Sequence, residues 1–133
     1  MANITTFTLV KDQCAGDMGE ITMNPESVSP PTASWRDSGV DGVAASRMRV
    51  TSALNPPTTS RTTFRPKITF SMPLERSDAD GDKSYSNVAR VEVQFVIPGG
   101  SVHCERQNLL KMFISTMNAE WAQTLVEDLE APW

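Results

Sequence analysis

Alternating apolar and polar side chains run through the middle of the chain and predict three β-strands. In residues 63–72 the alternation is complete, with apolar side chains at Phe64, Pro66, Ile68, Phe70 and Met72 and polar ones between them. Residues 47–55 and 90–97 alternate in the same way, with one exception each at Ser52 and Val96. Because successive side chains of a strand point to opposite faces, these segments predict a sheet with one apolar face and one polar face.

Shorter patterns on either side of these segments complete an α+β chain. Residues 4–10, 20–24 and 32–36 are rich in strand-forming types, and the second of these segments is predicted to end at Asn24–Pro25. Residues 74–86 are predicted to form a long acidic loop. Apolar side chains then recur at helical spacing, which predicts two helices capped by Ser101 and Asn118. Strands over about 4–97 followed by helices over about 101–130 predict an antiparallel sheet in a single domain, 1–133.

The predicted polar face carries many cations and few acids. Its candidate binding residues on the three strands are Arg49, Thr51, Ala53, Asn55, Thr63, Arg65, Lys67, Arg90, Glu92 and Gln94. Residues 43–73 contain five basic residues and no Asp or Glu. Arg and Lys bind phosphates, while Thr, Asn and Gln hydrogen-bond the exposed bases of single-stranded loops. The pattern makes this face a candidate for nucleic-acid binding, and a merely solvated outer face is the other interpretation that the residues leave open.

The net charge of the chain hides this basic segment. The 133 residues include 12 basic and 16 acidic side chains, which gives a net charge of −4. Taken alone, that value argues against a nucleic-acid partner. However, residues 101–133 carry five acids against two cations, and a partner meets one surface and not the sum of all surfaces. The acidic total therefore does not exclude an RNA-binding face.

Other features exclude several classes of protein. No apolar run approaches the roughly 20 residues of a membrane helix, and residues 1–10 lack the pattern of a signal peptide. Cys14 and Cys104 cannot make a disulfide framework. The single histidine, His103, has no metal-ligand or nucleophile motif around it. We therefore expect no enzymatic activity, no cofactor and no metal.

One acidic segment resembles a calcium loop in part. Asp78, Asp80 and Asp82 alternate as calcium ligands do, and Ser84 and Ser86 continue the alternation. However, Gly81 stands at the fourth loop position instead of the sixth, and Ala89 takes the place of the bidentate Glu. We interpret the segment as a solvated acidic loop, with calcium binding as the alternative.

The order of several short motifs resembles one known family. These motifs are Thr8-Leu9, Asn24-Pro25, Arg49-Val50-Thr51, Pro57, the alternating basic stretch 61–73, and Cys104-Glu105-Arg106. In this order, from one end of the chain to the other, they resemble the coat proteins of small single-stranded RNA bacteriophages, particularly the Qβ-like group. Each motif is short, and only their ordered combination is specific.

The resemblance implies a fold and a function. It implies an N-terminal β-hairpin, a five-stranded antiparallel sheet and two C-terminal helices, in an interlocked homodimer with a ten-stranded sheet. Such dimers assemble in the bacterial cytoplasm into the icosahedral shell of the virion, with the polar face inward on single-stranded viral RNA and no membrane partner. The same face binds an RNA hairpin, which represses translation and marks the genome for packaging. A dimeric RNA-binding regulator that does not assemble is the alternative.

The resemblance also implies RNA contacts at particular residues of this chain. The corresponding positions are Thr51, Ala53, Arg61, Thr63, Arg65, Lys67 and Glu92, with Arg49 and Arg90 beside them. Ala53 stands where a serine is usual, and Val88 or Arg90 occupies the region of a base-stacking tyrosine. Pro66 removes a ladder donor in mid-strand, so we expect a bulge or kink there. The 74–86 segment lacks the cysteines that cross-link some relatives, so we expect non-covalent shell contacts.

Overall fold

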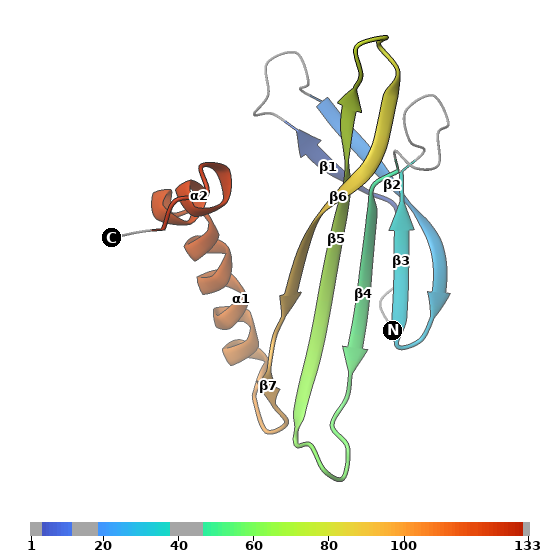
Figure 1. Cartoon of the computed structure of the whole chain (residues 1–133). Coiled ribbons are helices and arrows are strands. Elements are labelled where there is room, and N and C mark those ends of the chain that lie inside the picture. Colours follow the sequence, from blue (N-terminus) through green and yellow to red (C-terminus); the bar gives the residue numbers. More distant parts are fainter. Residues whose placement is uncertain (1–3, 12–18, 38–46, 132–133) are drawn as a thin grey trace. The chain divides into compact units, whose positions relative to one another are not determined.

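The computed structural model describes residues 4–11, 19–37 and 47–131. The chain divides into two compact units, Met1–Val96 and Ile97–Trp133. The first unit contains the strands that carry the predicted polar face, and the second contains the helices (Figure 1). That the two act together as one domain over 1–133 stays a prediction.

The first unit is an antiparallel sheet with an added hairpin. Its strands are β1 (Phe7–Lys11), β2 (Gly19–Ser29), β3 (Thr32–Arg36), β4 (Arg49–Asn55), β5 (Thr63–Ser77) and β6 (Lys83–Gln94). The first half of β2 pairs with β1 as a two-stranded hairpin. The second half of β2 begins a five-stranded sheet in the order β2–β3–β4–β5–β6. This arrangement confirms the predicted hairpin and five-stranded sheet.

The register of the strands separates the two faces as predicted. Across β4 and β5, Val50 pairs with Phe70, and across β5 and β6, Phe70 pairs with Val91 and Ile68 with Val93. These residues share the apolar face. The residues between them, which include most of the predicted binding positions, therefore share the polar face.

The apolar face has two halves that differ in burial. In the half beside the hairpin, here called the hairpin half, Met23 is 0% exposed. The rings of Phe7 and Trp35 also meet edge to face there, with 5.6 Å between centroids. In the other half, here called the open half, Leu54, Ile68 and Val91 are 47%, 48% and 55% exposed. The core of the first unit therefore lies under the hairpin.

The second strand is longer than predicted. It continues through Asn24–Pro25 to Ser29, so the prediction that it ends at Asn24–Pro25 is wrong. The register of β2 against β3 shifts between Pro25 and Ser27. A bulge of this kind accommodates an extra residue without ending the strand, and it follows closely after Met23 and Asn24, where β2 changes its pairing partner from β1 to β3.

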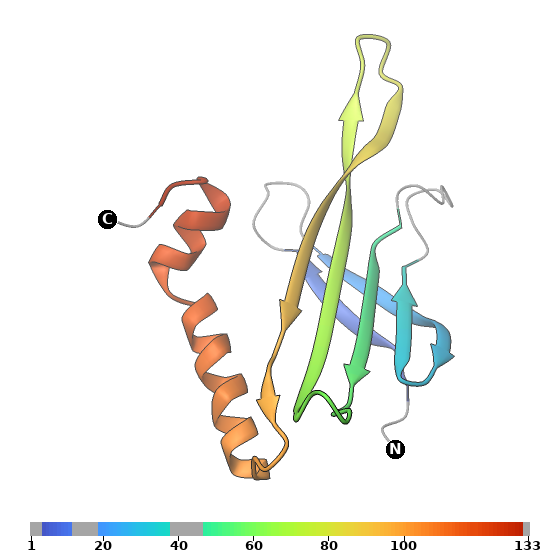
Figure 2. The same ribbon diagram turned by 60° about the horizontal axis from the view of Figure 1, so that its bottom comes forward.

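The predicted acidic loop 74–86 is mostly strand. Strands β5 and β6 pair as far as Ser77 and Lys83, which leaves 78–82 as the connection. Gly81 has φ of +83°, a conformation that favours glycine. Asp78 stabilises the turn because its Oδ1 accepts the backbone N–H groups of Asp80 and Asp82, each at 2.9 Å. Figure 2 shows β5 and β6 continuing together as a long hairpin beyond the other strands of the sheet.

Pro66 does not shift the register of its strand. It stays in register opposite Leu54, and the shift between β5 and β6 lies between Leu74 and Arg76 instead. The expected bulge at Pro66 is therefore wrong. The carbonyl of Pro66 accepts the N–H of Phe95 at 3.0 Å, just past the end of β6 at Gln94. Because an antiparallel residue directs its N–H and C=O to the same side, the missing donor falls just outside the β5–β6 pairing, which begins at Lys67 and Gln94.

The second unit contains a short strand, β7 (Ile97–Pro98), and two helices, α1 (His103–Met117) and α2 (Glu120–Glu127). The N-cap of α1 is Val102 and not Ser101, and Asn118 is the C-cap of α1 instead of the N-cap of α2. The backbone N–H of Val102 donates to Glu105 Oε2 at 2.9 Å, which closes the first turn. None of the helices formed by the described residues is long and apolar enough to cross a bilayer.

The helices present apolar side chains that nothing in the described chain buries fully. No residue of α1 is buried, and its predicted apolar stripe is exposed at Leu109, Leu110, Ile114 and Met117. In α2, only Ala122 is buried.

Candidate nucleic-acid interface

The register of β3 to β6 arranges the polar face in rows that run across the strands. The arginine row contains Arg36, Arg49, Ser71 and Arg90. The hydroxyl row contains Ser27, Ser34, Thr51, Thr69 and Glu92. The next row contains Thr32, Ala53, Lys67 and Gln94, and Asn55 pairs with Arg65 beyond it. Here, the polar face means these rows and the side chains that contact them.

A hollow lies over the hydroxyl row. It has a volume of about 380 Å³ and is lined by Ser27, Thr32, Ala33, Ser34, Arg49, Thr51, Ser52, Ala53, Lys67 and Thr69. Arg49 and Lys67 supply its positive charges, and serine and threonine supply hydroxyls that can donate or accept hydrogen bonds. This hydroxyl hollow has the chemistry to hold a flat polar group beside a phosphate.

Glu92 lies at one end of the hydroxyl row and contacts two cations. Its carboxylate is 3.3 Å from Lys67 Nζ and 3.7 Å from Arg90 Nη1. All three side chains are more than one-third exposed, so these pairs add little to stability. The pairs hold the long Lys67 and Arg90 side chains against the polar face. A larger anion that binds these two cations can replace the Glu92 carboxylate there.

Glu26 lies at the other end of the row, and the sequence patterns missed it. Its Oε1 is 2.7 Å from Arg36 Nη2, and its Oε2 is 3.4 Å from Arg49 Nη2. The hydroxyl of Ser34 also donates to Glu26 Oε2, at 3.3 Å. Glu26 was missed because the predicted second strand ended at Asn24, which left Glu26 off the sheet.

Three residues at and just before the start of β5 carry polar atoms that have no hydrogen-bond partner. These atoms are Arg61 Nε, Thr63 Oγ1 and Arg65 Nε, all shielded from solvent. The other end of the Arg61 guanidinium donates from Nη2 to the Pro56 carbonyl at 2.7 Å. Buried polar groups are usually paired, so these atoms could accommodate an oxygen-rich ligand.

Most of the predicted binding residues come together on this surface. Arg49, Thr51, Ala53, Lys67, Arg90, Glu92 and Gln94 lie in the rows, and Asn55, Thr63 and Arg65 continue them toward the start of β5. Arg61 lies apart from the rows, in the turn before β5, where it pairs with Thr58. That these residues bind RNA stays a prediction.

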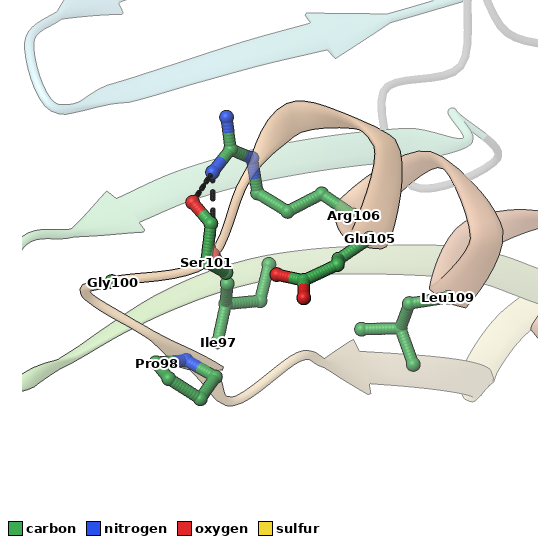
Figure 3. A pocket seen from close by; sticks show the side chains of 7 residues that line it. All are labelled: Ile97, Pro98, Gly100, Ser101, Glu105, Arg106 and Leu109. Carbon is green, nitrogen blue, oxygen red and sulfur yellow. Dashed lines mark hydrogen bonds between the residues drawn. The ribbon is translucent and has the colours of Figure 1, made fainter.

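A second hollow lies within the helical unit, where the chain enters α1. It has a volume of about 430 Å³ and is lined by Ile97, Pro98, Gly100, Ser101, Glu105, Arg106 and Leu109 (Figure 3). Arg106 Nη1 donates to the carbonyl and the hydroxyl of Ser101, and Glu105 accepts the N–H of Val102. Both charged groups are thus used to form the start of the helix.

The described residues contain no group of three or more His, Cys, Asp or Glu side chains placed to hold a metal. Cys104 is exposed in the first turn of α1, and Cys14 lies outside the described residues. In the 78–82 turn, Asp78 Oδ1 already accepts two backbone N–H groups.

Comparison with known proteins identifies one family and one fold. The family model for the levivirus coat protein matches residues 2–133. Among solved structures, the virus-like particle of Beihai levi-like virus 21 has a TM-score of 0.82 at 16% identity and covers 99% of each chain. The virus-like particle of bacteriophage ESE058 has a TM-score of 0.81 at 17% identity and covers 99% of this chain and 100% of that chain.

The capsid protein of bacteriophage GA is also similar, with a TM-score of 0.68 at 14% identity over 96% of this chain and 95% of that chain. At these identities the likeness establishes the fold, which is the levivirus coat fold of a curled antiparallel sheet followed by two helices. No curated protein sequence matches the chain.

Proposed function

The chain belongs to the levivirus coat protein family, and we propose that it assembles as interlocked homodimers into an icosahedral shell around single-stranded RNA. The family consists of structural capsid proteins, which confirms the expectations of a virion component and of a protein without enzymatic activity. The proposal adds three points: the dimer, the RNA partner, and recognition of an RNA hairpin that represses translation and marks the genome for packaging.

Dimer formation is supported by apolar surface and by an unpaired strand edge. The open half of the apolar face exposes Leu54, Ile68 and Val91, and α1 exposes a stripe along its length. Strand β6 pairs with β5 on one side and with no described strand on its other edge. An unpaired edge can accept another chain, and apolar surface of this kind usually marks an interface. Two β6 edges joined across a two-fold axis would give a ten-stranded sheet, and exchanged helices would cover the open halves.

The RNA partner is supported by the charge and the hydrogen-bonding groups of the polar face. Five cations share that face, namely Arg36, Arg49, Arg65, Lys67 and Arg90, against the two acids Glu26 and Glu92. The hydroxyl hollow lies among them. Cations hold phosphates, and hydroxyls in a hollow can bind the edge of an unstacked base, which is how proteins recognise RNA loops. The combination of a cationic face with a hydroxyl-lined hollow is the observation that carries this part of the proposal.

The methyl group of Ala53 lines the hydroxyl hollow where a hydroxyl is usual, so Ala53 offers no side-chain hydrogen bond to a base. We infer that the hydroxyl contacts come from Thr51, two residues before Ala53 on β4, and from Thr69, which pairs with Thr51 across β4 and β5. The hairpin that this chain prefers should therefore differ from those of relatives that carry a serine.

Assembly is tested by expressing the full-length protein in bacteria. The purified protein is then examined by size-exclusion chromatography and negative-stain electron microscopy. We expect uniform spheres of megadalton size whose absorbance spectrum shows enclosed RNA. A species that stays near 29 kDa, twice the 14.6 kDa chain, and binds RNA would support the non-assembling regulator instead. Selection from a pool of random hairpins then tests recognition, and a reporter with the selected hairpin at its start codon tests repression.

A further inference from the structure

Glu26 owes its position to the bulge in β2. Pro25 pairs with Trp35 on the apolar side, and Ser27 pairs with Ser34 on the polar side, which leaves Glu26 as the extra residue between them. A bulge redirects the side chain of its extra residue. Here the carboxylate is directed onto the polar face, where it contacts Arg36, Arg49 and Ser34.

The carboxylate of Glu26 bridges two arginines that would otherwise repel each other. Arg36 and Arg49 are direct partners across β3 and β4, and like charges in that position are unfavourable. One oxygen of Glu26 contacts each guanidinium, at 2.7 Å for Arg36 and 3.4 Å for Arg49. The three side chains together carry one positive charge, where the two arginines alone would carry two.

This arrangement changes what the polar face can bind. A phosphate that approaches Arg36 or Arg49 meets a carboxylate that is already paired with Nη2 of each guanidinium group. The same carboxylate accepts the hydroxyl of Ser34, which lines the hydroxyl hollow. The backbone of any RNA is thus held less strongly at this end of the face, while the hydroxyls that contact bases are kept in place.

We propose that Glu26 is a specificity-determining residue of the RNA-binding face. Its carboxylate competes with phosphates for Arg36 and Arg49, and so lowers the affinity for RNA of arbitrary sequence relative to RNA whose bases fit the hydroxyl hollow. Specific interfaces commonly include such a repulsive element. This inference rests on the proposed RNA-binding function and adds to it a residue that discriminates between RNAs.

The test is the salt dependence of binding to an oligouridine of about 20 nucleotides, a probe without a hairpin. The full-length protein is kept below the concentration at which it assembles. Each additional phosphate neutralised on single-stranded RNA steepens the slope of log K against log salt by about 0.7. We expect Glu26→Gln to bind oligouridine more tightly than the wild type, with a slope steeper by about 0.7 or more. Its advantage should therefore fall about threefold between 50 and 200 mM salt.

Glu75→Gln is the matched control. It removes the same charge from another paired carboxylate, which is 3.1 Å from Lys83 Nζ and lies near the far end of β5. We expect its slope to equal that of the wild type. A second variant guards against misfolding, since Arg36 and Arg49 face each other unscreened in Glu26→Gln. The double variant Glu26→Gln/Arg36→Gln restores the net charge of the cluster and should return the slope to the wild-type value.

The outcomes separate this inference from the function on which it rests. If the wild type binds oligouridine with a salt-dependent slope and Glu26→Gln binds equally or more weakly, Glu26 does not discriminate and this inference is wrong. A double variant with a slope shallower than the wild type would also overturn it, because Arg36 would then contact phosphate despite Glu26. If the wild type binds neither oligouridine nor selected hairpins, the proposed RNA-binding function itself fails.

Discussion

The two halves of the apolar face present similar side chains to very different surroundings. In the hairpin half, β1 and β2 fold over the sheet, Met23 is fully buried, and Trp35 both packs on Phe7 and donates its Nε1–H to the Thr5 carbonyl at 2.9 Å. In the open half, Leu54, Ile68 and Val91 are about half exposed. The same alternating pattern thus gives buried apolar side chains at one end of the sheet and half-exposed ones at the other.

This difference indicates which apolar surface the proposed dimer would bury and a single chain leaves exposed. Burial of a large aliphatic side chain is worth about 1.5–3 kcal/mol, and the open half forgoes much of this in the single chain. The hairpin half should therefore contribute stability within one chain, and the open half should contribute it only when chains associate.

Ile68→Asp should have the largest effect, because it places a charge in the open half. If a partner buries this surface, the unpaired carboxylate costs several kcal/mol, and neither dimers nor particles should form. Size-exclusion chromatography and electron microscopy measure the loss. Thr22→Asp, on the outward side of the β1–β2 hairpin where Thr22 is exposed, is the control and should assemble normally. Normal particles from Ile68→Asp would mean that no partner covers the open half.

Met23→Ala should have the next largest effect, because it opens a cavity in the hairpin half. Loss of a fully buried methionine side chain typically costs about 2–5 kcal/mol. Chemical denaturation followed by tryptophan fluorescence measures this, with Trp35 near the altered site. A loss below about 1 kcal/mol would show that the hairpin half is not the core of the first unit.

Dilution of the wild-type protein should give a smaller and diagnostic change. If the open half is completed by a second copy, unfolding is coupled to dissociation and the apparent stability depends on protein concentration. A tenfold dilution should then lower it by about 1.4 kcal/mol. Denaturation midpoints at three protein concentrations, all below the threshold of assembly, test whether unfolding is coupled to dissociation. Midpoints that do not move with concentration would contradict a dimer that forms as the chain folds.

The sequence predicted the two faces of the sheet better than the ends of its strands. The period-two pattern placed Ile68, Phe70 and Val91 together on one face, because alternation follows directly from strand geometry. It could not locate the end of β2, since a bulge allows a strand to pass Asn24–Pro25. Nor could it extend β5 and β6 through 74–77 and 83–86, where charged and polar residues pair as an exposed hairpin without an apolar pattern.

In the candidate interface, the face of each side chain followed from the sequence, but the contacts between side chains did not. Arg49, Lys67 and Glu92 were placed on one face from their own strands alone. Their ion pairs depended on cross-strand register, which a single sequence does not contain. Glu26 and Arg36 were missed because their contacts need both the bulge and that register. A glutamate directly after a proline at a predicted strand end is the one signal that could have drawn attention to them.

Lys67→Glu should have the smallest effect on stability, because it lies on the face opposite both halves. Lys67 is 38% exposed, and its pair with Glu92 is a surface ion pair, so the reversal should cost at most about 1 kcal/mol. RNA enclosed per particle should nonetheless fall, since the change places a negative charge beside the hydroxyl hollow. The measurements are the denaturation midpoint and the ratio of absorbance at 260 nm to that at 280 nm in purified particles.

Lys83→Glu, which reverses a charge at the start of β6 next to Glu75, is the control and should leave the RNA content unchanged. Lys67→Glu could instead lower the stability as much as Met23→Ala is expected to. That result would mean that the polar face belongs to the core and that the separation between the two faces is wrong.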